Sequence, residues 1–300
     1  MLVKSYNLRG AFFMSASMAA FVSNDAIMKI VGPKIGLAQS IFVRGFFCSI
    51  FIFIIFLMIT KNIQDCKLVF GRVLGRAFFD LLATILFLSA LLNMPFANVN
   101  AILQTLPLTV TLAASIVLKE KFGKKRALAI MLGLIGVLLI VKPGTEGFNI
   151  FSILAIGAVL SVTCRDLITR QMSQSIPAIF ISLVTSLVVT CSTGVYLIAF
   201  QKWQSLDYYI MLQLAFSGIF LMTGYFCSVE AMRYGSVDFV SPFRYTLMVW
   251  ALLIGYFIFG DVPDYLSLIG IVLIIITGLF TLYREALLRG KPFKFTNKKT

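Results

Sequence analysis

Charged side chains stand inside long apolar runs of this sequence, and they are its first candidates for chemistry. Asp25 and Lys29 are four residues apart and therefore share one face of a helix. Opposite charges at this spacing form either a structural ion pair or a site that gates or couples the passage of a solute. Asp166 and Arg170 repeat the arrangement 141 residues later, so we expect two equivalent pairs near opposite ends of the protein.

Two further apolar runs contain charged residues away from their ends. Arg44 stands in SIFVRGFF, about a third of the way into an apolar segment. A guanidinium there needs a carboxylate, backbone carbonyls or an anionic solute, because an unpaired charge is costly in a bilayer. Structural and substrate-binding interpretations of Arg44 both stay open. Arg76 and Asp80 are again four residues apart, and for these we predict a structural ion pair.

Polar patches in two later runs could contact a solute. Asn100 and Gln104 share one helix face shortly before Pro107, and their amides either bond neighbouring helices or bind a polar ligand. The run VDFVSPFRYTLMVW combines arginine, proline and aromatic residues that would suit a flat ligand or simply pack a core. We assign candidate substrate binding to Arg44, Asn100, Gln104, Ser241, Arg244, Tyr245 and Trp250. We assign candidate gating or coupling to Asp25, Lys29, Asp166, Arg170, Glu230 and Asp238.

The motifs of common enzymes are missing from the sequence. It has no histidine, and its five cysteines form no CxxC pair, so the usual general base and the usual metal ligands are lacking. It has no Walker GxxxxGK[ST], no HExxH and no GxSxG. We therefore expect no enzyme, no cofactor and no metal site, and any proton coupling must use a carboxylate such as Asp25, Glu230 or Asp238.

The composition indicates the elements that must position these residues. Hydrophobic residues make up 60% of the 300 and charged residues 13%, with a mean hydropathy of +0.97, which excludes a soluble domain. About 20 apolar residues cross a bilayer as a helix. The sequence holds ten such runs, at roughly 10–31, 36–59, 74–93, 96–118, 126–142, 150–170, 177–200, 208–232, 237–260 and 263–283. The first run is no signal peptide, because it carries Asp25 and Lys29 instead of a cleavage site.

The distribution of positive charge predicts the orientation. With a cytoplasmic N-terminus, inside segments hold 19 of the 26 Lys and Arg residues, outside segments hold only Lys34, Lys142 and Lys202, and four lie within spans. Both termini are therefore expected in the cytoplasm. The net charge of +14 is mostly this topology signal, and the basic tail 286–300 suits lipid headgroups rather than nucleic acid.

Weak internal matches suggest two equivalent halves. Beside the Asp25 and Asp166 pair, Asn100 aligns with Asp238 at a shift of 138, and Gly136 with Gly270 at a shift of 134. The halves are 1–145 and 146–285. Because each holds five helices, an odd number, the second must be inverted in the membrane. Inverted repeats are typical of transporters that work by alternating access.

The segments NDAIMK, VRGFF, TLPLTVTLAASIVLKEKFG, VKPG and SPFRYTLMVWALLIGYFIFGDVPD resemble the drug/metabolite transporter superfamily in its EamA-like ten-helix branch, over residues 8–285. The resemblance implies an all-α integral membrane protein with a central cavity lined by spans 1, 3, 4, 6, 8 and 9. It implies a secondary transporter of a small organic metabolite in the inner or plasma membrane, and we lean toward import of riboflavin or a similar heterocycle. Export of amino acids or drugs and import of S-adenosylmethionine are the alternatives, and a homodimer is left open beside a monomer.

Overall fold

The structure, a computed structural model, describes residues 2–59, 70–117, 124–142, 149–172, 177–234 and 240–289. Within these ranges the secondary structure is entirely helical. The predicted site residue Asp238 lies outside the described residues, as do the side chains of Arg170 and Ser241. Six helices are long and apolar enough to cross a membrane, and they contain Leu8–Ile35, Leu37–Met58, Gly71–Asn93, Ile150–Thr169, Ile179–Phe200 and Tyr208–Ser228.

Within the described residues, each predicted apolar run folds as helix. The elements are α1 (Leu2–Ile35), α2 (Leu37–Ile59), α3 (Phe70–Asn93), α4 (Phe96–Leu103), α5 (Leu106–Val117), α6 (Lys124–Val141), α7 (Ile150–Arg170), α8 (Ala178–Phe200), α9 (Tyr208–Tyr234), the 3₁₀ helix η2 (Ser241–Tyr245), α11 (Thr246–Phe259) and α12 (Tyr265–Arg289). Three of the later helices contain shorter apolar stretches, Ala127–Val141, Phe243–Phe259 and Tyr265–Phe280.

Two of the runs are interrupted at prolines. The fourth run divides into α4 and α5, and Pro107 stands in the first turn of α5, where a residue without an N–H is tolerated. At the break the amides of Gln104 and Thr105 bond to carbonyls three residues back. In the ninth run Pro242 stands in η2, directly before α11. Both breaks place polar side chains at a point where the regular helix stops.

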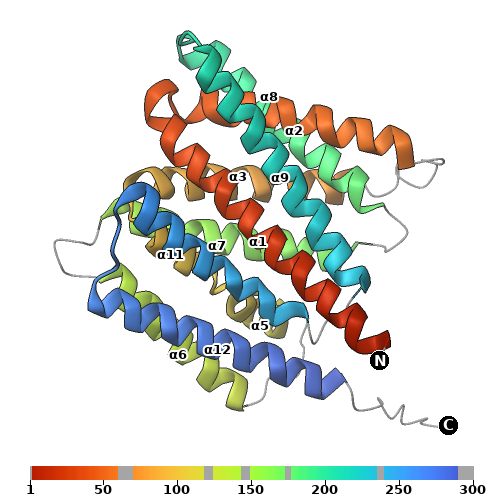
Figure 1. Cartoon of the computed structure of the whole chain (residues 1–300), viewed down its shortest axis with the longest axis vertical. Helices are drawn as coiled ribbons and strands as arrows, with labels where there is room; N and C mark the ends of the chain where they lie inside the picture. Colours follow the sequence, from red (N-terminus) through yellow and green to blue (C-terminus); the bar gives the residue numbers. More distant parts are fainter. Residues whose placement is uncertain are drawn as a thin grey trace.

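The helices pack in a pattern that survives exchange of the two halves. Exchanging the halves turns the α1–α9 contact into the α3–α7 contact and the α2–α9 contact into the α3–α8 contact. It leaves the α2–α8 and α6–α12 contacts unchanged. Figure 1 shows α2 and α8 at one edge of the bundle and α6 and α12 at the opposite edge. The remaining helices lie between these two edges.

The α6–α12 contact depends on two glycines. A Cβ on Gly136 would lie 2.8 Å from the carbonyl oxygen of Gly270, and a Cβ on Gly270 would lie 2.5 Å from the carbonyl oxygen of Gly136. Ile274 and Ile140 stand against them in the same reciprocal way. Small residues at such a crossing let two helix backbones approach closely.

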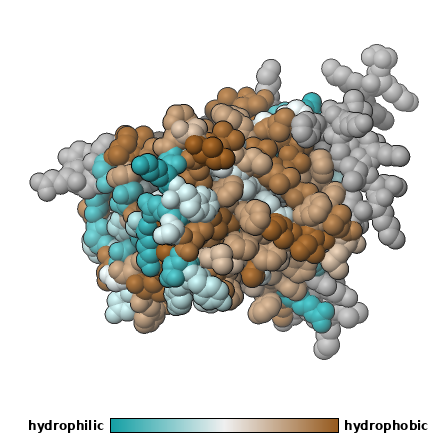
Figure 2. Space-filling view, turned by 90° about the horizontal axis from the view of Figure 1, so that it is seen from above, coloured by the Kyte–Doolittle hydropathy of each residue, from teal (hydrophilic) through white to brown (hydrophobic). Residues whose placement is uncertain are grey.

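Apolar side chains cover much of the outer surface. Figure 2 shows hydrophobic residues over most of the visible face and hydrophilic ones gathered toward one side. Large exposed apolar residues occur on helices of both edges, for example Phe53, Leu128, Ile198 and Ile276. Such a surface suits lipid and not water.

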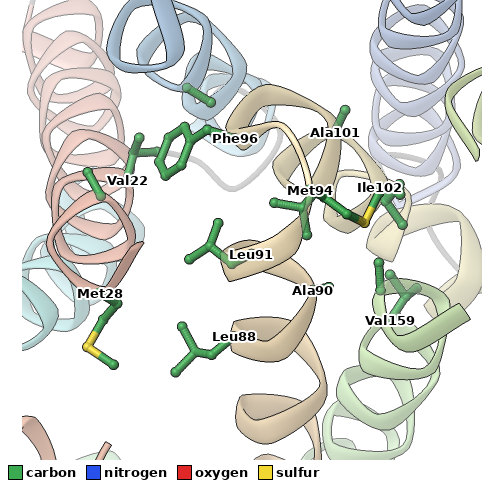
Figure 3. Close-up of a cluster of buried hydrophobic side chains, with 14 of the residues drawn as sticks. Val22, Met28, Leu88, Ala90, Leu91, Met94, Phe96, Ala101, Ile102 and Val159 are labelled. Carbon is green, nitrogen blue, oxygen red and sulfur yellow. The ribbon is translucent and has the colours of Figure 1, made fainter. Parts of the chain in front are cut away.

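The buried core holds α1 against the middle of the bundle. Figure 3 shows Val22 of α1 beside Phe96 of α4, and Leu88 and Leu91 pointing from α3 toward α1. These four residues are at most 1% exposed. The apolar packing fixes the rotation of α1 and thereby the direction of its polar residues.

Candidate functional site

A cavity of about 300 Å³ lies among α1, α2, α3, α7, α8 and α9, and Leu103 at the end of α4 also lines it. Its wall combines charged, hydroxyl and aromatic side chains, which include Phe21, Asn24, Asp25, Arg44, Cys48, Arg76, Asp80, Thr84, Phe87, Arg165, Ser186 and Tyr225. Spans 1, 3, 4, 6 and 8 supply lining residues, as the resemblance implied, but span 9 does not: among the described residues, none of spans 5, 9 and 10 lines the cavity. Spans 2 and 7 do contribute, which the resemblance did not imply, because α2 and α8 pack together beside α9.

Arg44 stands on the cavity wall because α2 approaches α8 closely. The neighbouring Gly45 leaves no room for a Cβ, since Thr190 Oγ1 of α8 lies against it. Arg44 is 7% exposed, and its Nη1 donates a hydrogen bond of 3.3 Å to Asn24 Oδ1 on α1. Its Nε is buried without a hydrogen-bond partner. A buried, partly unsatisfied guanidinium beside a cavity can bind an acceptor group of a ligand.

Asp25 faces the same cavity, and its predicted pairing with Lys29 is wrong. Asn24 Nδ2 donates to Asp25 Oδ1 at 2.9 Å. Lys29 turns instead to the end of the bundle where α1 ends, where its Nζ contacts the Met94 carbonyl and lies 3.9 Å from Asp261 Oδ2. The core packing that buries Val22 and Ala26 rotates the two polar residues toward different neighbours.

Lys29 belongs to a contact that joins three elements at that end. Its Nζ lies 5.3 Å from the centre of the Phe259 ring, and Asp261 Oδ2 accepts the Phe96 amide at 2.8 Å. Gln39 and the Gln204 backbone exchange two hydrogen bonds of 2.8 and 3.0 Å between α2 and the segment before α9. The cavity wall extends the other way, to Arg76 and Ser182 near the starts of α3 and α8.

The predicted ion pair between Arg76 and Asp80 is also wrong. Asp80 Oδ1 binds Arg165 Nη1 of α7 at 2.6 Å, and Arg165 Nη2 lies 2.9 Å from Asp166 Oδ1. Arg76 donates instead to Thr169 Oγ1 at 3.1 Å and to Thr185 Oγ1 at 2.6 Å. The close packing of α3 on α7 offers Asp80 a partner across the interface, which displaces the partner on its own helix.

The amide and aromatic candidates lie apart from the cavity. Asn100 Nδ2 bonds to the Phe96 carbonyl at 2.9 Å, and Asn100 Oδ1 is buried without a partner. Gln104 Nε2 reaches the Arg244 carbonyl at 3.5 Å, so the structure brings spans 4 and 9 together. Tyr245 points its hydroxyl at Gly278 of α12, and Trp250 is 38% exposed. None of them lines the cavity, and their role in binding stays a prediction.

Asn24, Arg165 and Tyr225 also line the cavity, and none of the three is among the site residues predicted from the sequence. Asn24 also accepts a hydrogen bond of 2.8 Å from Ser217 on α9. A signal was present for Arg165, since it is one of four basic residues inside the apolar runs. The sequence holds no such signal for Tyr225 or Asn24, because a single phenol or amide in an apolar run is common.

Comparison with known proteins identifies the family. The model of the EamA-like transporter family matches residues 8–142 and again residues 149–283. The chain belongs to the EamA-like transporter family. Its apolar helices therefore belong to a multi-pass membrane protein.

Relatives of this EamA-like chain are named for the solutes that they transport. An S-adenosylmethionine uptake transporter of Rickettsia conorii is 26% identical over 289 residues, which cover 94% of the chain and 95% of the relative. A riboflavin transporter of Vibrio cholerae is 25% identical over 285 residues, which cover 93% and 95%. A solved crystal structure shares the fold with a TM-score of 0.63 at 14% identity, over 96% of this chain and 99% of that one.

Proposed function

We propose that this protein is a secondary transporter that moves a small organic metabolite across the inner or plasma membrane by alternating access. The observation that carries the proposal is the cavity between helices of both halves, with Arg44 buried on its wall and Arg44 Nε unpartnered. An ionisable group within membrane-spanning helices is costly, so a solute pathway is its usual reason. The volume of about 300 Å³ suits a small metabolite.

Alternating access requires two equivalent halves, and we propose ten spans in two inverted five-helix repeats, 1–145 and 146–285, with a cytoplasmic tail 286–300. Three observations support this proposal. The family model matches the chain twice, the packing pattern survives exchange of the halves, and Gly136 meets Gly270 reciprocally. The excess of Lys and Arg on one side supports cytoplasmic termini.

The contacts around Lys29 support a role for it in gating. Lys29, Asp261 and the Phe96 amide join α1, α4 and the end of α11 at one end of the bundle, while the cavity wall reaches toward the other end. We propose that these contacts hold that end closed and that they open during transport. Asp166, Arg170, Glu230 and Asp238 are proposed to gate or couple at the opposite end.

For the solute we propose import of riboflavin or a similar heterocycle, with import of S-adenosylmethionine or export of amino acids or drugs as alternatives. The named relatives support the two import options. The aromatic wall of Phe21, Phe87 and Tyr225 supports a solute with a flat ring.

Uptake by proteoliposomes tests the proposal. Purified protein is reconstituted, and entry of labelled riboflavin, S-adenosylmethionine and amino acids is measured with and without an imposed pH gradient. We expect saturable uptake of at least one solute, strongly reduced in Arg44→Gln. Arg72→Gln, which removes an exposed guanidinium at the start of α3, is the matched control and should transport normally. Equal uptake by wild type, Arg44→Gln and empty liposomes would refute the proposal.

A further inference from the structure

We propose that Asp166 of α7 and Arg244 of η2 form an ion pair that closes the cavity at the end where α7 ends, in a state that alternates with the present one. The pair forms when the contact between Lys29 and Asp261 opens at the opposite end. The inference rests on the proposed transport function and names the two residues of a second gate. It gives Arg244 a role in gating in place of solute binding, since Arg244 does not line the cavity.

The two ends of the bundle are packed differently. At the α1 end, where α1, α3 and α11 end, a Cβ on Gly32 of α1 would lie 2.7 Å from Leu92 Cδ2 of α3. Exchange of the halves turns this contact into one between α7 and α9 at the α7 end, where α7 and α9 end and η2 begins. Among the described residues α7 and α9 have no comparable contact, and the cavity extends toward that end, to Arg76 and Ser182. The α1 end is therefore closed while the α7 end is open.

Arg244 presents an unpaired guanidinium at the α7 end. The residue is exposed, and no described residue forms a hydrogen bond or an ion pair with its side chain. Its backbone carbonyl alone is bound, by Gln104 Nε2 at 3.5 Å. Asp166 is the carboxylate whose charge attracts Arg244, although the two side chains are not in ion-pair contact. Closure would exclude solvent from the guanidinium and leave a costly unpaired charge unless a carboxylate met it.

Asp166 can take a second cation, because its present partner Arg165 also binds another acid. Arg165 Nε and Nη2 both contact Asp166 Oδ1, at 3.0 and 2.9 Å. Arg165 Nη1 binds Asp80 Oδ1 at 2.6 Å. The side chain of Asp80 is 13% exposed and that of Asp166 is 39% exposed, so Asp166 is the outer of the two acids. A carboxylate has two acceptor oxygens, and Asp166 can therefore bind Arg244 while Arg165 stays paired.

The helix α11 joins Arg244 to the contact that closes the α1 end. Arg244 stands two residues before α11, and Asp261 stands two residues after it. Asp261 Oδ2 lies 3.9 Å from Lys29 Nζ of α1, and the same amine stands over the Phe259 ring at the end of α11. The 14 residues of α11 span about 21 Å. One rigid helix thus carries a residue of each gate at its two ends.

The packing around α11 lets it tilt between the two gates. Between its ends α11 packs on α4 and α1, and Figure 1 shows it running beside α1. η2 packs on α1, α11 and α12 but has no comparable contact with α7 in the described part of the chain. A tilt about α4 that takes the end of α11 away from Lys29 brings η2 toward α7. The two ion pairs therefore exclude each other, and one end closes as the other opens.

Hydrogen exchange of the purified full-length protein, followed by mass spectrometry without any solute, tests the inference. Asp261→Asn removes the charge that faces Lys29, while its side-chain oxygen can still accept the Phe96 amide. We expect exchange about 3- to 10-fold faster in the last turns of α1 and α3. We expect exchange slower by a similar factor in η2 and the last turn of α7, because the population shifts to the state that is closed there. Exchange in α6 should stay unchanged, which shows that the fold is retained.

A second substitution tests the partner at the α7 end. Arg244→Gln added to Asp261→Asn should abolish the slow exchange at the α7 end and return the α1 end toward the wild-type rate. Arg244→Lys keeps the cation and should preserve the pattern of Asp261→Asn. Lys202→Gln, which removes an exposed cation before α9, is the matched control and should also preserve it.

The outcomes separate this inference from the transport function. Exchange at the α7 end that is the same in wild type and Asp261→Asn would overturn the inference, as would a pattern that Arg244→Gln leaves unchanged. Neither result bears on uptake by liposomes. Failure of the wild type to take up labelled riboflavin, S-adenosylmethionine or amino acids better than empty liposomes would overturn the transport function itself.

Discussion

The Asp80–Arg165 ion pair between α3 and α7 permits a quantitative prediction. The side chains are 13% and 23% exposed, and the closest nitrogen and oxygen are 2.6 Å apart. Breaking a buried pair costs about 3–5 kcal/mol when the remaining charge has no other partner. After Asp80→Asn, Arg165 keeps Asp166 at 2.9 Å, so we expect a loss of about 2 kcal/mol. After Arg165→Gln two carboxylates lose their cation, so we expect the full loss of about 3–5 kcal/mol.

These losses are measured by unfolding the purified protein in mixed micelles through titration with a denaturing detergent. The free energy of unfolding lost in the double variant Asp80→Asn/Arg165→Gln should be smaller than the sum of the two single losses by about 1–3 kcal/mol. Arg76→Gln paired with Asp80→Asn is the control, because these side chains bind different partners, and their losses should add. Additive losses for Asp80 and Arg165, or coupling of Asp80 to Arg76 instead, would refute the reasoning.

Three further outcomes are expected. Gly136→Val should lower the melting temperature and cost about 1–3 kcal/mol, because a Cβ would lie 2.8 Å from a backbone oxygen of α12; unchanged thermal denaturation would contradict the packing. Transport lost on reversing Lys29 or Asp261 alone should return in the double reversal, since these charges face each other; failure of uptake to return would count against the pair. The hydrogen bond from Lys142 lowers the pKa of Asp264 from 3.8 to about 2. The ionised Asp264 carboxylate therefore stabilises the fold above about pH 4, and this stabilisation is lost as the pH falls toward 2. Melting curves of wild type and Asp264→Asn should therefore differ above pH 4 and converge near pH 2, and a constant difference would exclude this linkage.

The sequence by itself determined the class of the protein and the elements of the fold. Continuous apolar runs can satisfy their backbone in lipid only as helices, and the described residues of every predicted run are helical or stand at a break between helices. The breaks within two of the runs lie near Pro107 and Pro242, which lack an amide donor. The family also followed from short motifs, and the double match of its model bears out the resemblance.

The tertiary structure alone decided which charges meet. Spacing along one helix predicted pairs of Asp25 with Lys29 and of Arg76 with Asp80, yet both acids face other partners. Contacts across helix interfaces depend on how each helix is rotated, and that rotation is set by the burial of apolar residues far away in sequence. The cavity and the joint placement of Asp25, Asn24 and Arg44 on its wall arise from that packing, for which a single sequence carries no local signal.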